Sequence, residues 1–135
     1  MQTIWITGGS SGIGFATAKE FINNNWQVVI SSSNKIKLES AKKKLELNNN
    51  NKNLVHAIVC DISSKNNVDE TINSIEKNIG KIDIALLNAS AYSPNKNQIF
   101  DISNYELLVD VNIKGTLYCV NTVSYTHLRA HETDS

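Results

Sequence analysis

A glycine-rich turn near the start of the chain lies between an apolar run and a helical pattern. Residues 3–6 are predicted to form a buried strand, residues 15–22 a helix, and the turn between them reads Thr7-Gly8-Gly9-Ser10-Ser11-Gly12-Ile13-Gly14. Gly8 allows a tight turn at backbone angles that other residues avoid. Gly12 has no side chain to hold a pyrophosphate away from the backbone, and Gly14 lets the helix pack closely on the strand. Because a helix N-terminus presents free N–H groups and a positive dipole end, the turn is predicted to bind phosphate; a glycine-rich loop without a ligand is the alternative.

Polar or small residues also follow the three other predicted strands. They are Ser31-Ser32-Ser33-Asn34 at the end of residues 27–31, Asp61-Ile62 after residues 54–60, and Asn88-Ala89-Ser90 after residues 82–87. Open parallel sheets bind ligands at the carboxyl ends of their strands, so these segments are expected to face one crevice. The Asp61 carboxylate can accept a hydrogen bond from the exocyclic amine of adenine. An acid favoured by the dipole of the following helix is the alternative.

The elements that position these residues alternate between strand and helix. One helix is predicted over residues 35–47 and another over residues 103–123. A helix between them is expected to begin at a cap, Ser63 or Ser64, and to end at Gly80. Residues 48–53 and 88–101 are expected to be loops. The apolar strand 54–60 is expected to be covered on both faces. The alternation predicts an α/β fold, a Rossmann-type doubly wound parallel sheet of order 3-2-1-4 with helices on both faces, ending before a fifth strand.

Composition limits the classes of function. The 135 residues suit one domain, and the 13 basic and 13 acidic side chains give a net charge of zero, so neither nucleic acid nor an anionic membrane is expected as a partner. The chain has no apolar run long enough to span a bilayer, and no secretory signal is expected. Cys60 and Cys119 are expected to be buried free thiols, which favours the cytoplasm.

The string from Thr7 to Gly14, taken with the later strand ends, resembles the short-chain dehydrogenase/reductase family over residues 1–123. The resemblance implies an NAD(P)-dependent oxidoreductase that moves a hydride between nicotinamide and a carbonyl or alcohol carbon of a small molecule. It implies that Asp61 and the Ile62 backbone bind adenine, and that Asn88-Ala89-Ser90 replaces the family's Asn-Ala-Gly. The cofactor-binding residues are then expected to be Gly8, Ser10, Ser11, Gly12, Ile13, Gly14, Ser32, Ser33, Asp61, Ile62, Asn88, Ala89 and Ser90.

Asn112 resembles the asparagine of the family's catalytic tetrad, which holds a water in the proton relay; a hydrogen-bonded role in the core is the alternative. It lies in Asp110-Val111-Asn112-Ile113-Lys114-Gly115-Thr116. No metal site is expected, because His127 and His131 have no third ligand.

The end of the second strand bears on the choice of cofactor. An acid there would pair with the adenosine ribose and repel a 2′-phosphate, but Ser32 occupies the place and no acid appears before Glu39. The family's usual basic residue is also absent, since Ser11 and Ser33 stand at its positions, and Lys35 or Lys37 could take its role. NADP is therefore favoured over NAD.

The family's catalytic Tyr-x-x-x-Lys is expected on later elements. Tyr125 begins a Tyr-x-x-x-Arg, but it follows Asn112 with no intervening strand, and arginine cannot replace the tunable lysine. Residues 124–135 differ in composition from the rest and resemble translated adapter read-through; a divergent natural tail is the alternative. The chain is thus expected to be an N-terminal fragment, inactive alone, of an enzyme that forms homo-oligomers. A non-catalytic dinucleotide-binding module is the competing hypothesis, and Asn112 favours the enzyme.

Overall fold

The computed structural model describes residues 1–47, 52–89 and 102–121 of the chain. In chain order the elements are β1 (Thr3–Thr7), α1 (Gly12–Asn23), β2 (Gln27–Ser32), α2 (Lys35–Leu47), the 3₁₀ turn η1 (Lys52–Leu54), β3 (Val55–Val59), α3 (Lys65–Asn78), β4 (Ile84–Leu87), α4 (Ile102–Val109) and the π-helical segment η2 (Asp110–Gly115). Helical residues 116–121 continue from η2.

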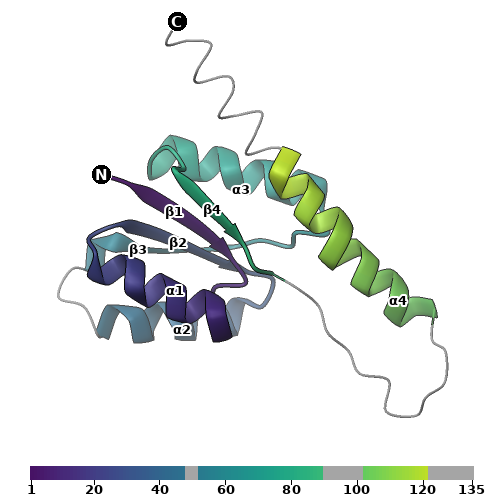
Figure 1. Ribbon diagram of the computed structural model, residues 1–135, viewed down its shortest axis with the longest axis horizontal. Coiled ribbons are helices and arrows are strands. Elements are labelled where there is room, and N and C mark those ends of the chain that lie inside the picture. The colour runs from purple at the N-terminus through teal and green to yellow at the C-terminus, as the bar shows by residue number, and fades with distance from the viewer. Residues whose placement is uncertain (48–51, 90–101, 122–135) are drawn as a thin grey trace, which may run out of the picture.

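The strands form one parallel sheet in the order β3-β2-β1-β4, as predicted (Figure 1). Thr7 at the end of β1 pairs with Ser31 on β2 and with Leu87 on β4, and Ser32 pairs with Val59 on β3. This register brings the carboxyl ends of all four strands to one edge of the sheet. The glycine turn, the β2–α2 turn, the β3–α3 turn and Asn88 all begin at that edge.

Helices cover both faces of the sheet, with α1 and α2 on one side and α3 with the helical residues after η2 on the other, whereas α4 projects beyond the sheet (Figure 1). Strand side chains alternate between the two faces, so each face has its own core. On the first face Ile4, Ile6, Val28 and Ile30 pack with Ala18, Ile22, Leu38, Ala41 and Leu45. On the second face Trp5 and Val29 pack with Val68, Ile72, Ile75 and Cys119.

Helix α3 shows how local sequence sets the boundaries. Ser64 is the N-cap, because its hydroxyl oxygen accepts the Asn67 N–H at 3.2 Å. Of the two predicted candidates, Ser64 and not Ser63 is therefore the cap of α3. At the other end the N–H groups of Ile79 and Gly80 both donate to the Ile75 carbonyl at 2.9 Å, which ends the helix at the predicted place.

The predicted strand boundaries needed small corrections. Strand β4 begins at Ile84 rather than Ile82, because the Ile82 N–H donates to the Glu76 carboxylate and the Thr3 N–H donates to the Asp83 carboxylate at 2.8 Å. These side chains replace main-chain partners of the ladder. Strand β3 is shorter than residues 54–60, and side chains on both its faces pack as expected, Ala57 on the first core and Ile58 on the second, although Val59 at its end is 42% exposed.

The last helix differs most from its prediction. A single α-helix was expected over residues 103–123, but α4 gives way to the π-helical η2 at Asp110. Gly115 in η2 packs on the loop after β3, where an added Cβ would lie 2.8 Å from the Ile62 carbonyl oxygen. Along the same helix Ile113 and Leu117 are more than half exposed. Within the described part of the chain, no helix has both the length and the apolar character to cross a membrane.

Candidate functional site

A cavity of about 710 Å³ lies at the carboxyl edge of the sheet, where the four strand ends meet. Most of the predicted cofactor-binding residues line it: Gly8, Ser10, Ser11, Gly12, Ile13, Ser32, Ser33, Asp61, Ile62, Asn88 and Ala89. Segments far apart in the sequence therefore share one wall, as the parallel topology predicts. The volume is within the range of about 300–1,000 Å³ that is usual for small-molecule and cofactor sites.

The glycines of the turn have different structural roles. Gly8 has a φ of +67°, and an added Cβ would lie 2.9 Å from the Cα atom of Ala89. Gly12 has a φ of +57°, but an added Cβ would meet no atom within 4 Å. At Gly14 a Cβ would collide with the Gly8 carbonyl oxygen and lie 2.8 Å from Asn88 Nδ2. Gly8 and Gly14 are thus required by packing, whereas the missing side chain of Gly12 opens onto free space at the cavity.

Thr7 and Asn88 join the glycine turn to the end of β4. The buried Thr7 hydroxyl oxygen accepts the N–H groups of Asn88 at 3.0 Å and Ala89 at 3.1 Å. The Asn88 side-chain amide donates to the Gly8 carbonyl at 3.2 Å. Because both ends of this network are fixed to strands, the turn is held in one position relative to Asn88.

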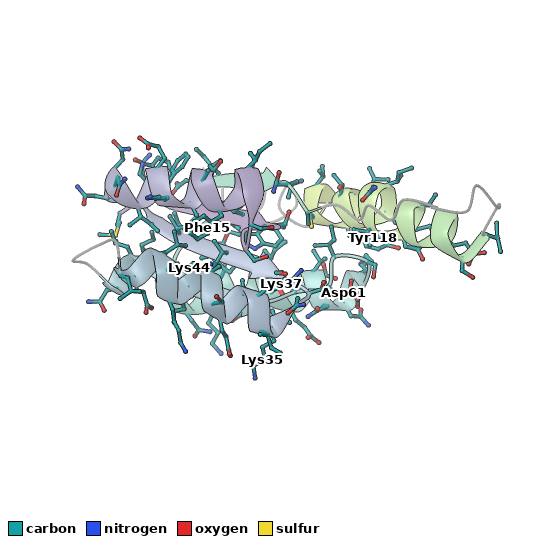
Figure 2. The ribbon with its side chains drawn as sticks, turned by 90° about the horizontal axis from the view of Figure 1, so that it is seen from below. Phe15, Lys35, Lys37, Lys44, Asp61 and Tyr118 are labelled. Atoms are coloured by element: carbon teal, nitrogen blue, oxygen red, sulfur yellow. The ribbon has the colours of Figure 1, made fainter. Side chains whose placement is uncertain are left out.

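The β2–α2 turn is held by its own side chains. The Ser32 hydroxyl oxygen accepts the Asn34 N–H at 3.2 Å, and Asn34 Oδ1 accepts the Lys37 N–H at 3.0 Å. Asn34 is therefore the cap of α2. Lys37 lines the cavity together with Ser32, Ser33 and Asn34, whereas Lys35 is absent from its lining. Figure 2 shows Lys37 on the side of Asp61 and Lys35 pointing away from the body of the molecule.

The β3–α3 turn contributes Asp61 and Ile62. The Asp61 side chain is exposed at the cavity, and its Oδ1 atom accepts the Ser63 N–H at 3.0 Å and the Ser63 hydroxyl at 2.6 Å. Asp61 thus stabilises the turn before α3, while Ser64 caps the helix. Ile62 is buried beside Gly115, and Val111 of η2 also lines the cavity.

Asn112 follows Val111 within η2. Asn112 is exposed and is not part of the cavity lining. π-helical turns are rare and occur frequently at functional sites. Ser90, Tyr125, His127, His131 and the boundary at residue 124 lie outside the described residues.

Neither cysteine has the character of a nucleophile. Both are buried free thiols, as expected, although Cys60 borders the cavity. Burial raises the pKa of both thiols, that of Cys119 to about 12. They are therefore protonated near neutral pH, and a thiol rather than a thiolate is a poor nucleophile.

Sequence reasoning missed four residues of the cavity wall: Thr7, Ser63, Cys60 and Val111. The first two are polar residues at a strand end and in a helix-capping turn, and that position was a usable signal. No signal pointed to Val111, because its place depends on how the last helix packs on Ile62. Gly9 was also missed as a packing residue: an added Cβ would lie 2.7 Å from the Ile30 Cβ atom.

Comparison with known proteins places the chain in a family. The family model for short chain dehydrogenase matches residues 2–133. An uncharacterized oxidoreductase of Staphylococcus saprophyticus is 31% identical over 118 residues, covering 87% of this chain and 50% of that protein. One from Staphylococcus aureus is 32% identical over 123 residues, covering 91% and 51%. The chain therefore spans about half the length of these curated relatives.

Solved structures share the architecture. A short chain dehydrogenase from Bacillus anthracis matches with a TM-score of 0.87 at 25% identity, covering 96% of this chain and 52% of that one. The RhlG/NADP active-site complex of Pseudomonas aeruginosa matches with a TM-score of 0.78 at 20% identity, covering 90% and 46%, and shows the fold alone. By the family match and these relatives, the chain belongs to the short-chain dehydrogenase family.

Proposed function

We propose that this chain is the dinucleotide-binding part of an NAD(P)-dependent oxidoreductase acting on a small-molecule carbonyl or alcohol. The cavity at the four strand ends is the observation that carries the proposal, above all Gly12, whose missing Cβ opens onto free space. Family membership supports the oxidoreductase class. The cofactor and the substrate class are our inference.

The residues around the cavity fit a dinucleotide. We expect the pyrophosphate to lie against the Gly8–Gly14 turn, where the start of α1 and the hydroxyls of Ser10 and Ser11 supply donors. Ser11 is the N-cap of α1 but its side chain makes no capping hydrogen bond, so among the described residues its hydroxyl is not committed to the helix.

The adenosine is expected between the β2–α2 and β3–α3 turns. Asp61 engages Ser63 through Oδ1 alone in the described structure, so its Oδ2 can accept the adenine amine. Ile62 and Val111 supply apolar surface at the same wall. Asn88 and Ala89 close the other side, where we expect the nicotinamide ribose. Ser90, which follows them, is proposed to contact the cofactor as well.

When bound, the nicotinamide ring would accept or donate the hydride. The described residues of this chain bind and orient the cofactor rather than move the substrate proton. Asn112 is proposed as a positioning residue that holds a water of the proton relay, as the family resemblance implies. Its place in the π-helical η2, next to the cavity residue Val111, supports this role.

We also propose NADP as the preferred cofactor, a cytoplasmic location and homo-oligomers of the complete protein. The absence of an acid at Ser32 and Ser33 supports NADP, since no carboxylate repels a 2′-phosphate there. The Pseudomonas structure of the same fold is itself an NADP complex. The exposed Ile113 and Leu117 support oligomers, because contiguous apolar surface commonly marks interaction sites.

Calorimetric titration with NADPH and NADH tests the binding site, and saturable binding of either nucleotide is the expected result. No heat of binding from a folded chain would contradict the proposal. Turnover is tested separately by following nicotinamide absorbance with a panel of carbonyl compounds. We expect the complete protein to turn over and the 135-residue chain to bind without turnover.

Two outcomes would change this assignment. Binding without turnover by the complete protein would support the non-catalytic binding module instead. Turnover by the 135-residue chain that is lost in Tyr125→Phe would assign the acid–base role to Tyr125. That result would contradict the expected inactivity of the fragment.

A further inference from the structure

The described lining of the cavity contains two charged side chains, Lys37 and Asp61. The Asp61 carboxylate is held by Ser63 on the β3–α3 side. Lys37 forms no ion pair with any described carboxylate, whereas Lys42, Lys65 and Lys114 each pair with an acid of their own helix. An unpaired ammonium group in a cavity wall is available to an anionic ligand.

The backbone separates Lys37 from the neighbouring lysine. Lys35 and Lys37 are two residues apart in the first turn of α2, and side chains at that spacing point to different sides of a helix. Lys37 lines the cavity and Lys35 does not. Figure 2 shows the same division, with Lys37 toward Asp61 and Lys35 directed outward. Sequence alone left the two lysines equivalent.

The turn before Lys37 presents hydroxyl groups and no acid. Ser32 accepts the Asn34 N–H through its oxygen, so its hydroxyl proton can still be donated. Ser33 is exposed at the cavity beside it. The Lys37 N–H is already donated to Asn34 Oδ1, so the side-chain ammonium, and not this backbone group, is the free donor. An ammonium and two hydroxyls suit a phosphate monoester.

We propose that Lys37 is the specificity-determining residue for the cofactor and binds the 2′-phosphate of NADP, assisted by the hydroxyls of Ser32 and Ser33. The inference rests on the proposed dinucleotide site and assigns its selectivity to one side chain. NAD has a neutral hydroxyl where NADP has the phosphate. Lys37 therefore strengthens the binding of NADP and leaves that of NAD nearly unchanged.

Calorimetric titration of the chain as encoded, with NADP and NAD separately, tests the proposal. Lys37→Ala should weaken NADP binding by about tenfold or more, because it removes a charge-assisted hydrogen bond, while NAD binding stays within about twofold. Lys35→Ala is the matched control and should leave both affinities within about twofold. Lys37→Gln, which keeps the length of the side chain, should behave as Lys37→Ala does.

Two further measurements test whether Lys37 recognises the 2′-phosphate itself. Adenosine 2′,5′-bisphosphate should bind the wild type more tightly than adenosine 5′-monophosphate, and Lys37→Ala should remove most of that difference. The affinity for NADP should also fall more steeply with salt than that for NAD, because ionic strength screens exposed charges. In Lys37→Ala the two salt dependences should converge.

The outcomes separate this inference from the proposed function. If both nucleotides bind and Lys37→Ala leaves their affinity ratio unchanged, Lys37 is not the selective residue and the dinucleotide site stands. An equal loss of NADP affinity in Lys35→Ala would show that the positive charge of α2 as a whole attracts the phosphate. That result would also overturn the inference. If the folded wild type binds neither nucleotide, both proposals are wrong.

Discussion

The two turns that form the phosphate side of the cavity are built in different ways. The β1–α1 turn is determined by its backbone: Gly8 and Gly14 leave no space for a Cβ, and Gly8 and Gly12 have positive φ angles. The β2–α2 turn is held by side chains, through the hydrogen bonds of Ser32 and Asn34. Many sequences can form the second turn and few can form the first. In the proposed function, the first turn binds the pyrophosphate and the second turn selects between NADP and NAD.

The largest effect is expected at the β1–α1 turn. Gly12→Val should lower the affinity for both NADP and NAD by about 100-fold, because its side chain would occupy the open space beside the turn and displace about two charge-assisted hydrogen bonds to phosphate. Calorimetry measures the loss. Ala16→Val, at an exposed position of α1, is the control and should bind normally. Unchanged affinity of Gly12→Val would show that the pyrophosphate lies elsewhere.

Gly14→Ala sharpens the comparison within the same turn. The added methyl group would collide with the Gly8 carbonyl oxygen and crowd Asn88 Nδ2, so the free energy of unfolding should fall by about 2 kcal/mol. Chemical denaturation followed by circular dichroism measures the change. Gly14 would thus be required by packing, whereas Gly12 is required by its positive φ and by the phosphate that it is proposed to admit. An unfolding free energy equal to that of the wild type would contradict the packing role.

Ser32→Asp tests whether the β2–α2 turn determines the preference between NADP and NAD. A carboxylate beside the 2′-phosphate should weaken NADP binding by about tenfold, or 1.4 kcal/mol, with little change for NAD. The aspartate can still accept the Asn34 N–H, so the turn is preserved. Ser32→Asn has the same shape without the charge and is the matched control. A constant ratio of NADP to NAD affinity would mean that Ser32 does not face the adenosine ribose.

The smallest effect is expected from the cap of α2. Asn34→Ala removes the acceptor of the Lys37 N–H and should lower the free energy of unfolding by about 1 kcal/mol. Asn34→Asp retains an acceptor and should restore most of the stability. Chemical denaturation curves of the wild type, Asn34→Ala and Asn34→Asp measure these differences in stability. Equal curves for Asn34→Ala and the wild type would show that this hydrogen bond does not stabilise the turn.

The contrast between the turns also explains what could be predicted from the sequence. The bounds of α2 and the strand order agree with the structure, because apolar periodicity and right-handed crossovers leave few alternatives. Gly8 was assigned correctly to the turn and Gly14 to close packing, since glycine spacing reflects backbone constraints, but α1 begins at Gly12, three residues before the predicted start. Each of these features is local or is imposed by topology.

The features that escaped prediction depend on distant contacts. The start of β4 was displaced by hydrogen bonds from Thr3 and Ile82 to acidic side chains, which no periodicity reveals. The apolar residues of the π-helical η2, Val111 and Ile113, are two residues apart, and this pattern does not reveal its wider turn. Val111 entered the cavity wall only because Gly115 packs on Ile62.

The hydrogen bond between Trp5 and Ser31 has an optical consequence. The Trp5 indole is fully buried in β1, and its N–H donates at 2.9 Å to the hydroxyl of Ser31, which borders the cavity. The second tryptophan, Trp26, packs edge-on against Phe21 and is not part of the cavity wall. A Trp26→Phe chain would therefore contain a single tryptophan, next to the proposed nucleotide site. Reduced nicotinamide absorbs where tryptophan emits, so this chain would report binding through energy transfer without any added label.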